Sequence, residues 1–368
     1  MLAPATLIVA CLFAAILGFV AHRASICTVR AVAEIVSART AFMLASIGKS
    51  ALWVVALTLP FLWLMPAAAN GIGGCRLTAT ALAGGLLFGF GAAINGGCAY
   101  STMTRLVDGE MRMAVSIGGF AIGIVTFVAL VDLDWIARPQ RTPALIGSVI
   151  TFALVISLVL AAWAIYEVPR IWRKRPMHLR IHEMVLSPHY RLSTAALVIG
   201  VASAAIFLLI RTPGYTITFQ NFVQGVVGKG APPPVSSLIL LAAVAAGMLA
   251  STLQRGSFKL DWRPQWSWLR NIFGGVLMGL GTAMLPGGND ALVLYGMPGF
   301  SPHAIPAYAA LLIGAVIGVL ALKHIGGLDT RVVCSNDIYR AEVQSRGSIL
   351  NSHPPRETSA ARSGARRA

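Results

Sequence analysis

Nine apolar stretches in this chain of 368 residues are long enough to cross a lipid bilayer. A helix needs about 20 apolar residues for that crossing, and inside the hydrocarbon only helices and closed barrels satisfy their backbone hydrogen bonds. We therefore predict an all-α polytopic membrane protein with about nine transmembrane helices. The stretches cover residues 3–21, 41–64, 77–95, 112–131, 144–165, 194–210, 236–253, 271–285 and 305–323.

The composition supports this prediction and argues against other classes. Hydrophobic residues make up 57% of the chain and charged residues 11%, whereas soluble domains carry about a quarter charged residues. The net charge of +16 would be compatible with nucleic-acid binding. The Lys and Arg residues, however, lie between the apolar stretches and in the C-terminal segment, as in the cytoplasmic loops of membrane proteins. Topology therefore explains this charge, and we expect membrane lipids, and not nucleic acid, among the partners.

The cysteines and the N-terminus exclude two further interpretations. The five cysteines are an odd number without C-x-x-C spacing, so they predict neither a disulfide framework nor a metal site. We expect no cofactor. The first apolar stretch has no basic segment before it and no A-x-A sequence after it, and we interpret it as a retained span rather than a signal peptide.

Positive charge predicts the orientation, because cytoplasmic loops collect Lys and Arg. The most basic loop follows the fifth stretch, and a second basic segment runs from Arg255 to Arg270. These loops and the Arg-rich C-terminus are expected in the cytoplasm, which places the N-terminus outside. Four regions follow: a first transmembrane half, a basic cytoplasmic loop, a second transmembrane half and a disordered cytoplasmic tail. They cover residues 1–165, 166–193, 194–325 and 326–368.

A glycine-rich segment occurs twice. Gly84–Gly91 matches Gly274–Gly281 nearly position for position, and each is followed by a Gly-Gly pair and a polar or thiol residue. The predicted orientation places the two copies in opposite directions, as in transporters with inverted repeats, where broken helices meet near the middle of the membrane. Close helix packing through small residues is the alternative explanation for part of the glycine content. A weaker match relates residues 18–25 to residues 247–257.

The first break, Gly96-Gly97-Cys98, is followed by Tyr100 and Ser101. If a helix begins at Cys98, its first N–H groups lack partners and its dipole favours an anion and a thiolate. The alternative is that Cys98 is a small buried apolar residue.

The other cysteines are less informative. Cys27 follows the first span and precedes a short apolar segment of a length that suits a re-entrant or interfacial helix, so a functional and a packing role remain open. We interpret Cys11 as a packing residue. Cys75 and Cys334 receive no role.

Charged and polar residues within apolar stretches are further candidates. Lys49 lies about eight residues inside the second stretch, where a cation would attract an anion in transit, with snorkelling to the interface as the alternative. The second break has the sequence Gly287-Gly288-Asn289-Asp290. Asp290 is predicted either to take part in transport as a protonatable group or to cap the following helix. Near the first break, we expect Arg105 to form an ion pair within its loop.

The segments around Cys98 and Cys27, together with the second glycine-rich segment, resemble the YeeE/YedE sulfur-transport family. The resemblance extends over most of residues 1–323. It implies a bacterial inner-membrane protein, and thiosulfate importers belong to that family. It also implies that Cys27 and Cys98 are two of the cysteines along which the substrate passes. A third path cysteine of the family corresponds to Asn289 in this chain.

We therefore predict a transporter, not an enzyme, that takes up a small sulfur-containing anion such as thiosulfate. The predicted path residues are Cys27, Lys49, Gly96, Gly97, Cys98, Tyr100, Ser101, Gly287, Gly288, Asn289 and Asp290. The sequence has no G-x-x-x-x-G-K-[ST] motif, so energy is expected from a gradient or a partner such as a cytoplasmic sulfurtransferase-like protein. Two alternatives remain: a transporter of another solute that uses Asn289 and Asp290, and a membrane-bound enzyme that carries a persulfide on Cys98.

Overall fold

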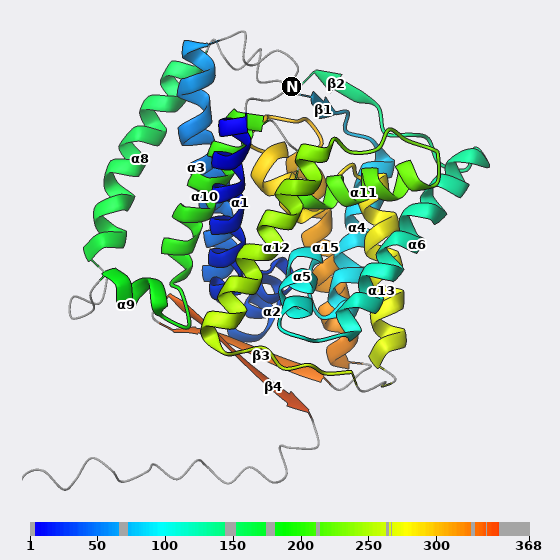
Figure 1. The fold of residues 1–368 in the computed structure, drawn as a ribbon. Coiled ribbons are helices and arrows are strands. Elements are labelled where there is room, and N and C mark those ends of the chain that lie inside the picture. The colour runs from blue at the N-terminus through cyan, green and yellow to red at the C-terminus, as the bar shows by residue number, and fades with distance from the viewer. Residues whose placement is uncertain are drawn as a thin grey trace, which may run out of the picture.

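The protein is an α-helical, multi-pass membrane protein, described here from a computed structural model (Figure 1). The structure describes residues 4–65, 73–143, 152–173, 181–210, 214–262, 265, 267–324, 328–335 and 337–345. Within these residues, nine long helices correspond to the nine predicted stretches. They are α1 (Pro4–Ala24), α3 (Phe42–Leu64), α4 (Ala79–Asn95), α6 (Arg112–Asp132), α8 (Ala153–Arg173), α10 (Leu192–Ile210), α12 (Val235–Arg255), α13 (Ser267–Met284) and α15 (Ala304–His324).

Eight helical segments of the described chain are long and apolar enough to cross a membrane. The ninth long helix, α13, does not meet this criterion, because Arg270 and Asn271 lie in its first turns. It nevertheless packs lengthwise between α4 and α6. The predicted count of about nine is therefore approximate, and the predicted class is confirmed.

Short helices and two strand pairs complete the fold. The short helices are α2 (Thr28–Ala38), α5 (Ala99–Val107), α9 (Ile181–Leu186), α11 (Tyr215–Val226) and α14 (Asn289–Ala291), the last continuing into the π-helical turn η3 (Leu292–Gly296). Strands β1 (Gly73–Cys75) and β2 (Arg141–Pro143) pair antiparallel, as do β3 (Leu328–Ser335) and β4 (Ile338–Ser345). The α2 helix confirms the short helix that was expected after Cys27.

Two predicted regions differ from the structure. The tail was expected to be disordered from residue 326, whereas residues 328–335 and 338–345 pair as the β3–β4 hairpin. The hairpin turn is held from outside its own sequence, because Asp337 accepts hydrogen bonds from the N–H groups of Leu192 and Ser193. The loop predicted over residues 166–193 is also partly helical, since α8 continues to Arg173 and α9 follows. The start of the fifth stretch, residues 144–151, lies outside the described residues.

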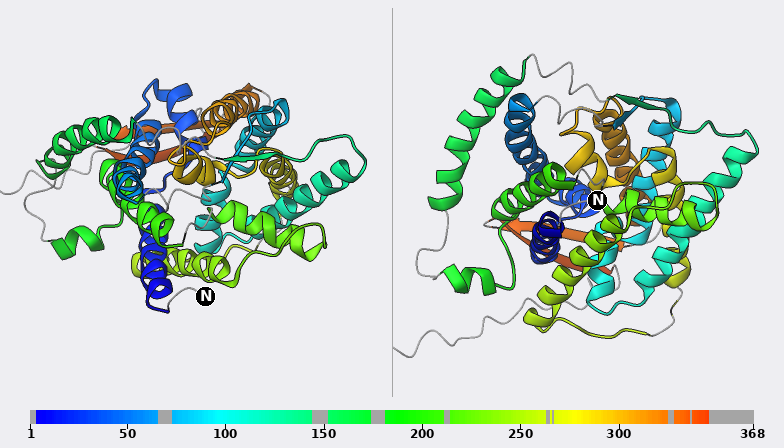
Figure 2. Two further views of the ribbon diagram at one scale, coloured as in Figure 1. Left: turned by 90° about the horizontal axis from the view of Figure 1, so that it is seen from above. Right: turned by 45° about the horizontal axis from the view of Figure 1, so that its top comes forward.

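Eight of the long helices form two groups, and α8 lies outside them against α3 (Figure 2). In one group α1, α3, α10 and α12 pack together, and in the other α4, α6, α13 and α15 do. The short helices α2, α5 and α11 and the turn η3 each contact both groups. The two breaks in the chain therefore lie where the groups meet.

Glycines allow the second group to pack closely. A Cβ atom at Gly84 would lie 2.8 Å from the carbonyl oxygen of Gly281, and one at Gly281 would lie 2.6 Å from that of Gly84. Gly91 and Gly274 oppose each other in the same reciprocal way. The two copies of the glycine-rich segment thus pack against each other, on α4 and α13. Close packing, the alternative explanation for these glycines, accounts for this part of the repeat.

Substitution of Gly89 tests this packing. A Cβ atom there would lie 1.9 Å from the backbone oxygen of Leu311 in α15, a contact that only a backbone shift relieves. We expect Gly89→Ala to lower the free energy of unfolding by about 1–3 kcal/mol, measured as a lower apparent melting temperature of the purified protein. The control is Gly118→Ala in α6, where a Cβ meets no atom within 4 Å and a small gain of up to about 1 kcal/mol is expected. Equal effects of the two substitutions would contradict the packing argument.

Candidate functional site

The structure brings Cys27 and Cys98 together. Each residue directly precedes a short helix, Cys27 before α2 and Cys98 before α5. The backbone N–H of Cys98 donates a hydrogen bond to the sulfur of Cys27, with an N···S distance of 3.4 Å. Both side chains are fully buried, and both thiols are free. Two cysteines that are 71 residues apart thus form one site.

The helices α2 and α5 both begin at this cysteine pair. Neither cysteine side chain caps its helix, so N–H groups of the first turns remain available. The N–H groups of Thr28 and Ser101 face the Cys98 thiol. Because the N-terminus of a helix carries partial positive charge, two such ends side by side favour an anion at the thiols.

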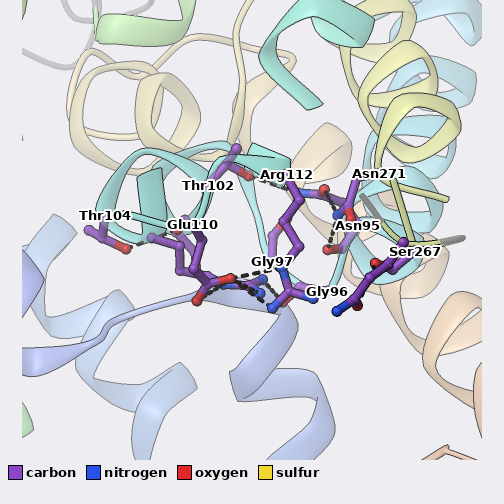
Figure 3. Close-up of polar contacts among 12 residues, drawn as sticks. Asn95, Gly96, Gly97, Thr102, Thr104, Glu110, Arg112, Ser267 and Asn271 are labelled. Carbon is purple, nitrogen blue, oxygen red and sulfur yellow. Dashed lines mark hydrogen bonds and ion pairs between the residues drawn. The ribbon is translucent and has the colours of Figure 1, made fainter. Parts of the chain in front are cut away.

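Polar contacts hold the first Gly-Gly break in place (Figure 3). Gly96 ends α4 with a left-handed backbone, φ +79°. The Asn95 side chain donates to the carbonyl oxygen of Gly97 at 3.1 Å and to the Thr102 hydroxyl at 2.8 Å. The Asn271 amide of α13 donates in turn to the Asn95 side-chain oxygen at 2.7 Å. The break is therefore fixed to a helix of the other half of the chain.

Sequence reasoning did not identify Asn95 and Asn271 as functional positions. Both amides are almost fully buried. A buried amide needs hydrogen-bond partners, and the signal in the sequence was an Asn just after the first copy of the glycine-rich segment and another just before the second. That signal does not reveal that the two residues bond to each other.

The second break is stabilised by the N-terminus of α11. The backbone of Gly287 is left-handed, with φ +125°. Gly288 N–H donates to the hydroxyl of Thr216 at 2.9 Å, and this hydroxyl donates to Asp290 at 2.6 Å. The N–H of Thr216 also points to the Asp290 carboxylate, at 3.3 Å. A Cβ atom at Gly214 would lie 2.3 Å from that carboxylate, so only glycine fits there.

Asp290 therefore caps a helix, but not the one expected. The sequence left open whether it caps the following helix, whereas the structure places its carboxylate at the start of α11, more than 70 residues earlier. Its neighbour Asn289 reaches the first half of the chain, because its amide donates to the Thr28 hydroxyl at 3.4 Å. The two breaks thus lie next to each other.

A cavity of about 60 Å³ lies between the two breaks. A volume of this size holds roughly four water molecules, or one small ion. Its polar lining includes Cys27, Thr28, Tyr100, Asn289 and Asp290. The remainder is mostly apolar: Leu17, Ala21, Ile26, Ile47, Ser50, Ile199, Val293 and Leu294. Four of the predicted path residues therefore line one space, with Cys98 hydrogen-bonded to its wall.

Lys49 lies elsewhere. Its ammonium group pairs with the buried carboxylate of Glu167 in α8, at 2.5 Å, and Arg170 contacts the same carboxylate at 3.4 Å. Lys49 is not among the residues that line the cavity. Sequence reasoning missed Glu167, because it fell within the predicted basic loop rather than in the fifth span. Lys49 thus has a partner in a peripheral helix.

A polar network fastens the far end of α5. The His22 ring lies 3.1 Å from the carboxylate of Asp108, which also accepts from the hydroxyls of Thr252 and Ser257. Burial alone would raise the pKa of Asp108, but the hydrogen bonds from His22, Ser257 and Thr252 outweigh it and lower the pKa below its ordinary value. The network joins the ends of α1, α5 and α12, and so positions the helix that starts at Cys98.

The predicted ion pair of Arg105 is confirmed. Its guanidinium binds Glu110 at 2.7 Å, and Arg112 binds the same carboxylate (Figure 3). Of the remaining cysteines, Cys11 and Cys75 are partly buried and free, and the side chain of Cys334 lies outside the described residues.

Comparison with known proteins identifies one family. A family model described as "Sulphur transport" matches residues 23–317, which is most of the chain and includes both breaks and every cavity-lining residue except Leu17 and Ala21. No curated protein matches the chain.

Asp108→Asn tests the network at the end of α5. Because the pKa of Asp108 is lower in the folded protein, its stabilising effect is present above the unfolded pKa of about 3.9 and is lost as the pH falls through the folded pKa. We expect the variant to melt at a lower temperature than the wild type at pH 7, with a difference that shrinks toward pH 3. Asp132→Asn, at an exposed ion pair, is the control and should change little. If the melting temperatures of the variant and the wild type differ equally at pH 7 and pH 3, the ionised Asp108 carboxylate is not what stabilises the network.

Proposed function

The chain belongs to the sulphur transport family, the YeeE/YedE family, and on that basis we propose that it carries a small anion of the thiosulfate type into the cell. It is a membrane protein of a transporter family. The proposed location is the bacterial inner membrane, with the N-terminus outside and the C-terminus in the cytoplasm.

The cysteine pair at the cavity carries this proposal. A thiol is a weak donor with a polarisable sulfur atom, which suits contact with the terminal sulfur of thiosulfate. The N-terminal turns of α2 and α5 supply partial positive charge at the thiols. The ion then moves by exchanging non-covalent contacts from one thiol to the other.

The arrangement of the breaks supports a path through this cavity. The two glycine-rich segments oppose each other reciprocally on α4 and α13, and each leads into a Gly-Gly break. We propose that they belong to an inverted repeat, in which the two halves alternately open the cavity to the outside and to the cytoplasm. A cytoplasmic sulfurtransferase-like protein is the proposed acceptor.

The Asp290 carboxylate is compatible with an anionic substrate in this scheme. Its two oxygens accept from the hydroxyl and the N–H of Thr216, at the N-terminus of α11. Its negative charge is therefore compensated by that helix end. Asn289, at the position of the family's third cysteine, can donate a hydrogen bond to an oxyanion.

Uptake of labelled thiosulfate by cells that lack other importers tests the proposal. We expect Cys98→Ala and Cys27→Ala each to reduce the uptake rate at least tenfold, about 1.4 kcal/mol, because each removes a contact along the path. Cys11→Ala, which changes a thiol on the first helix away from the cavity, should retain wild-type uptake. Full uptake by Cys98→Ala would refute a relay between thiols, and no uptake by the wild type would refute the substrate.

A variant of Asp290 distinguishes the proposed function from transport of another solute. The Asp290 carboxylate in the cavity wall is the observation that favours this alternative. If Asp290 serves as a cap, Asp290→Asn should keep most thiosulfate uptake, because an amide oxygen still accepts from Thr216. Uptake is measured at equal amounts of folded protein in the membrane. Loss of uptake in a folded variant would show that the charge itself takes part, as the alternative requires.

A further inference from the structure

Three tyrosine hydroxyls around the cysteine pair have no hydrogen-bond partner among the described residues. They belong to Tyr100 of α5, Tyr215 of α11 and Tyr308 of α15. The Tyr100 and Tyr308 side chains are 8% and 7% exposed, and the hydroxyl of Tyr215 is buried as well. Three helices from distant parts of the sequence thus each contribute one buried, unpaired donor.

One of these tyrosines lines the cavity, and the other two lie beside residues that form its wall. Tyr100 lines it, and its ring packs edge-on against that of Tyr215 with the ring centres 5.3 Å apart. The titratable groups around Tyr215 are Asp290, Tyr100 and the two cysteines. Tyr308 lies beside Thr28 at the start of α2, without good hydrogen-bond geometry, and has the same two cysteines as neighbours.

An unpaired hydroxyl in an apolar interior is unfavourable, and buried tyrosines in native proteins usually find a partner. Phenylalanine would fill the same space without this cost. Three unpaired hydroxyls at one site therefore indicate a ligand that accepts hydrogen bonds there. None of the described residues that line the cavity is Lys or Arg, so direct contacts to an anion in it come from neutral donors and helix ends, with Arg30 of α2 as a charge near Cys27.

We propose that Tyr100, Tyr215 and Tyr308 form the oxygen-binding set of the transport site. The oxygen atoms of the substrate accept from these hydroxyls, while its terminal sulfur lies against Cys27 and Cys98. The inference rests on the proposed function and narrows its substrate class to oxygen-bearing sulfur anions. Hydrosulfide, which has no oxygen atoms, leaves the three donors unpaired and is discriminated against.

Tyrosine-to-phenylalanine variants test the set, because they remove only the hydroxyl. The affinity of the purified protein for thiosulfate and for hydrosulfide is measured by calorimetry, together with the melting temperature without ligand. We expect Tyr100→Phe and Tyr215→Phe each to weaken thiosulfate binding about tenfold or more, and to leave hydrosulfide binding unchanged. The melting temperature without ligand should stay equal or rise, since a purely structural hydroxyl would lower it on removal.

The matched control is Tyr190→Phe, whose hydroxyl donates to the carbonyl oxygen of Val185 outside the site; it should not change thiosulfate binding. If Tyr100→Phe does not fold, Tyr215→Phe and Tyr308→Phe carry the test. Unchanged thiosulfate affinity in folded variants overturns the inference, as does wild-type binding of hydrosulfide as tight as that of thiosulfate. If thiosulfate uptake still depends on Cys98 in that case, the proposed function stands and only the oxygen-binding set fails. If the wild-type protein takes up no thiosulfate, both the proposed function and the oxygen-binding set are refuted.

Discussion

Backbone that leaves a helix inside a membrane must find its hydrogen-bond partners within the protein, and the structure around the cavity depends on this constraint. The chain leaves its helices at Gly96-Gly97 and at Gly287-Gly288. At the first break the Asn95 side chain donates to the Gly97 carbonyl oxygen, and the Asn271 amide donates to the Asn95 carbonyl oxygen, so side chains supply partners for the backbone. At the second, Thr216 does so from the start of another helix. Each break is thus sustained by side chains buried in protein and not by lipid or bulk water.

The helix ends at the two breaks have different hydrogen-bond acceptors. At the first, a backbone N–H of Cys98 points to the sulfur of Cys27, a weak acceptor, so the partial charge of two helix ends remains largely available. At the second, the carboxylate of Asp290 is a strong acceptor and compensates the N-terminus of α11. The anion-attracting side of the cavity is therefore the cysteine side.

Much of the fold was predictable from the sequence, because the span length and the Gly-Gly breaks are local features. The partners of buried polar groups were not, since they depend on contacts between distant segments. Lys49 was expected in the path, but its partner Glu167 appears only once α8 is placed beside α3. Asp290 was recognised as a possible cap, yet the helix it caps lies more than 70 residues earlier. The hairpin after residue 328 escaped prediction because its turn is held by α10.

The two halves of the chain differ at their breaks: the first has cysteines and the second has Asn289. Under the proposed function, this difference affects the orientation of the substrate in the cavity. A uniform row of thiols would leave the orientation of a two-ended ion undefined. Here the sulfur atoms are concentrated at Cys27 and Cys98, while Asn289 and Tyr100 in the cavity wall, and Tyr215 and Tyr308 beside it, carry nitrogen and oxygen donors. An ion with one soft sulfur and several hard oxygens satisfies both kinds of group in one orientation only. Under the proposed function, Asn289 at the position of the family's third cysteine sharpens, rather than abolishes, the preference for such an ion.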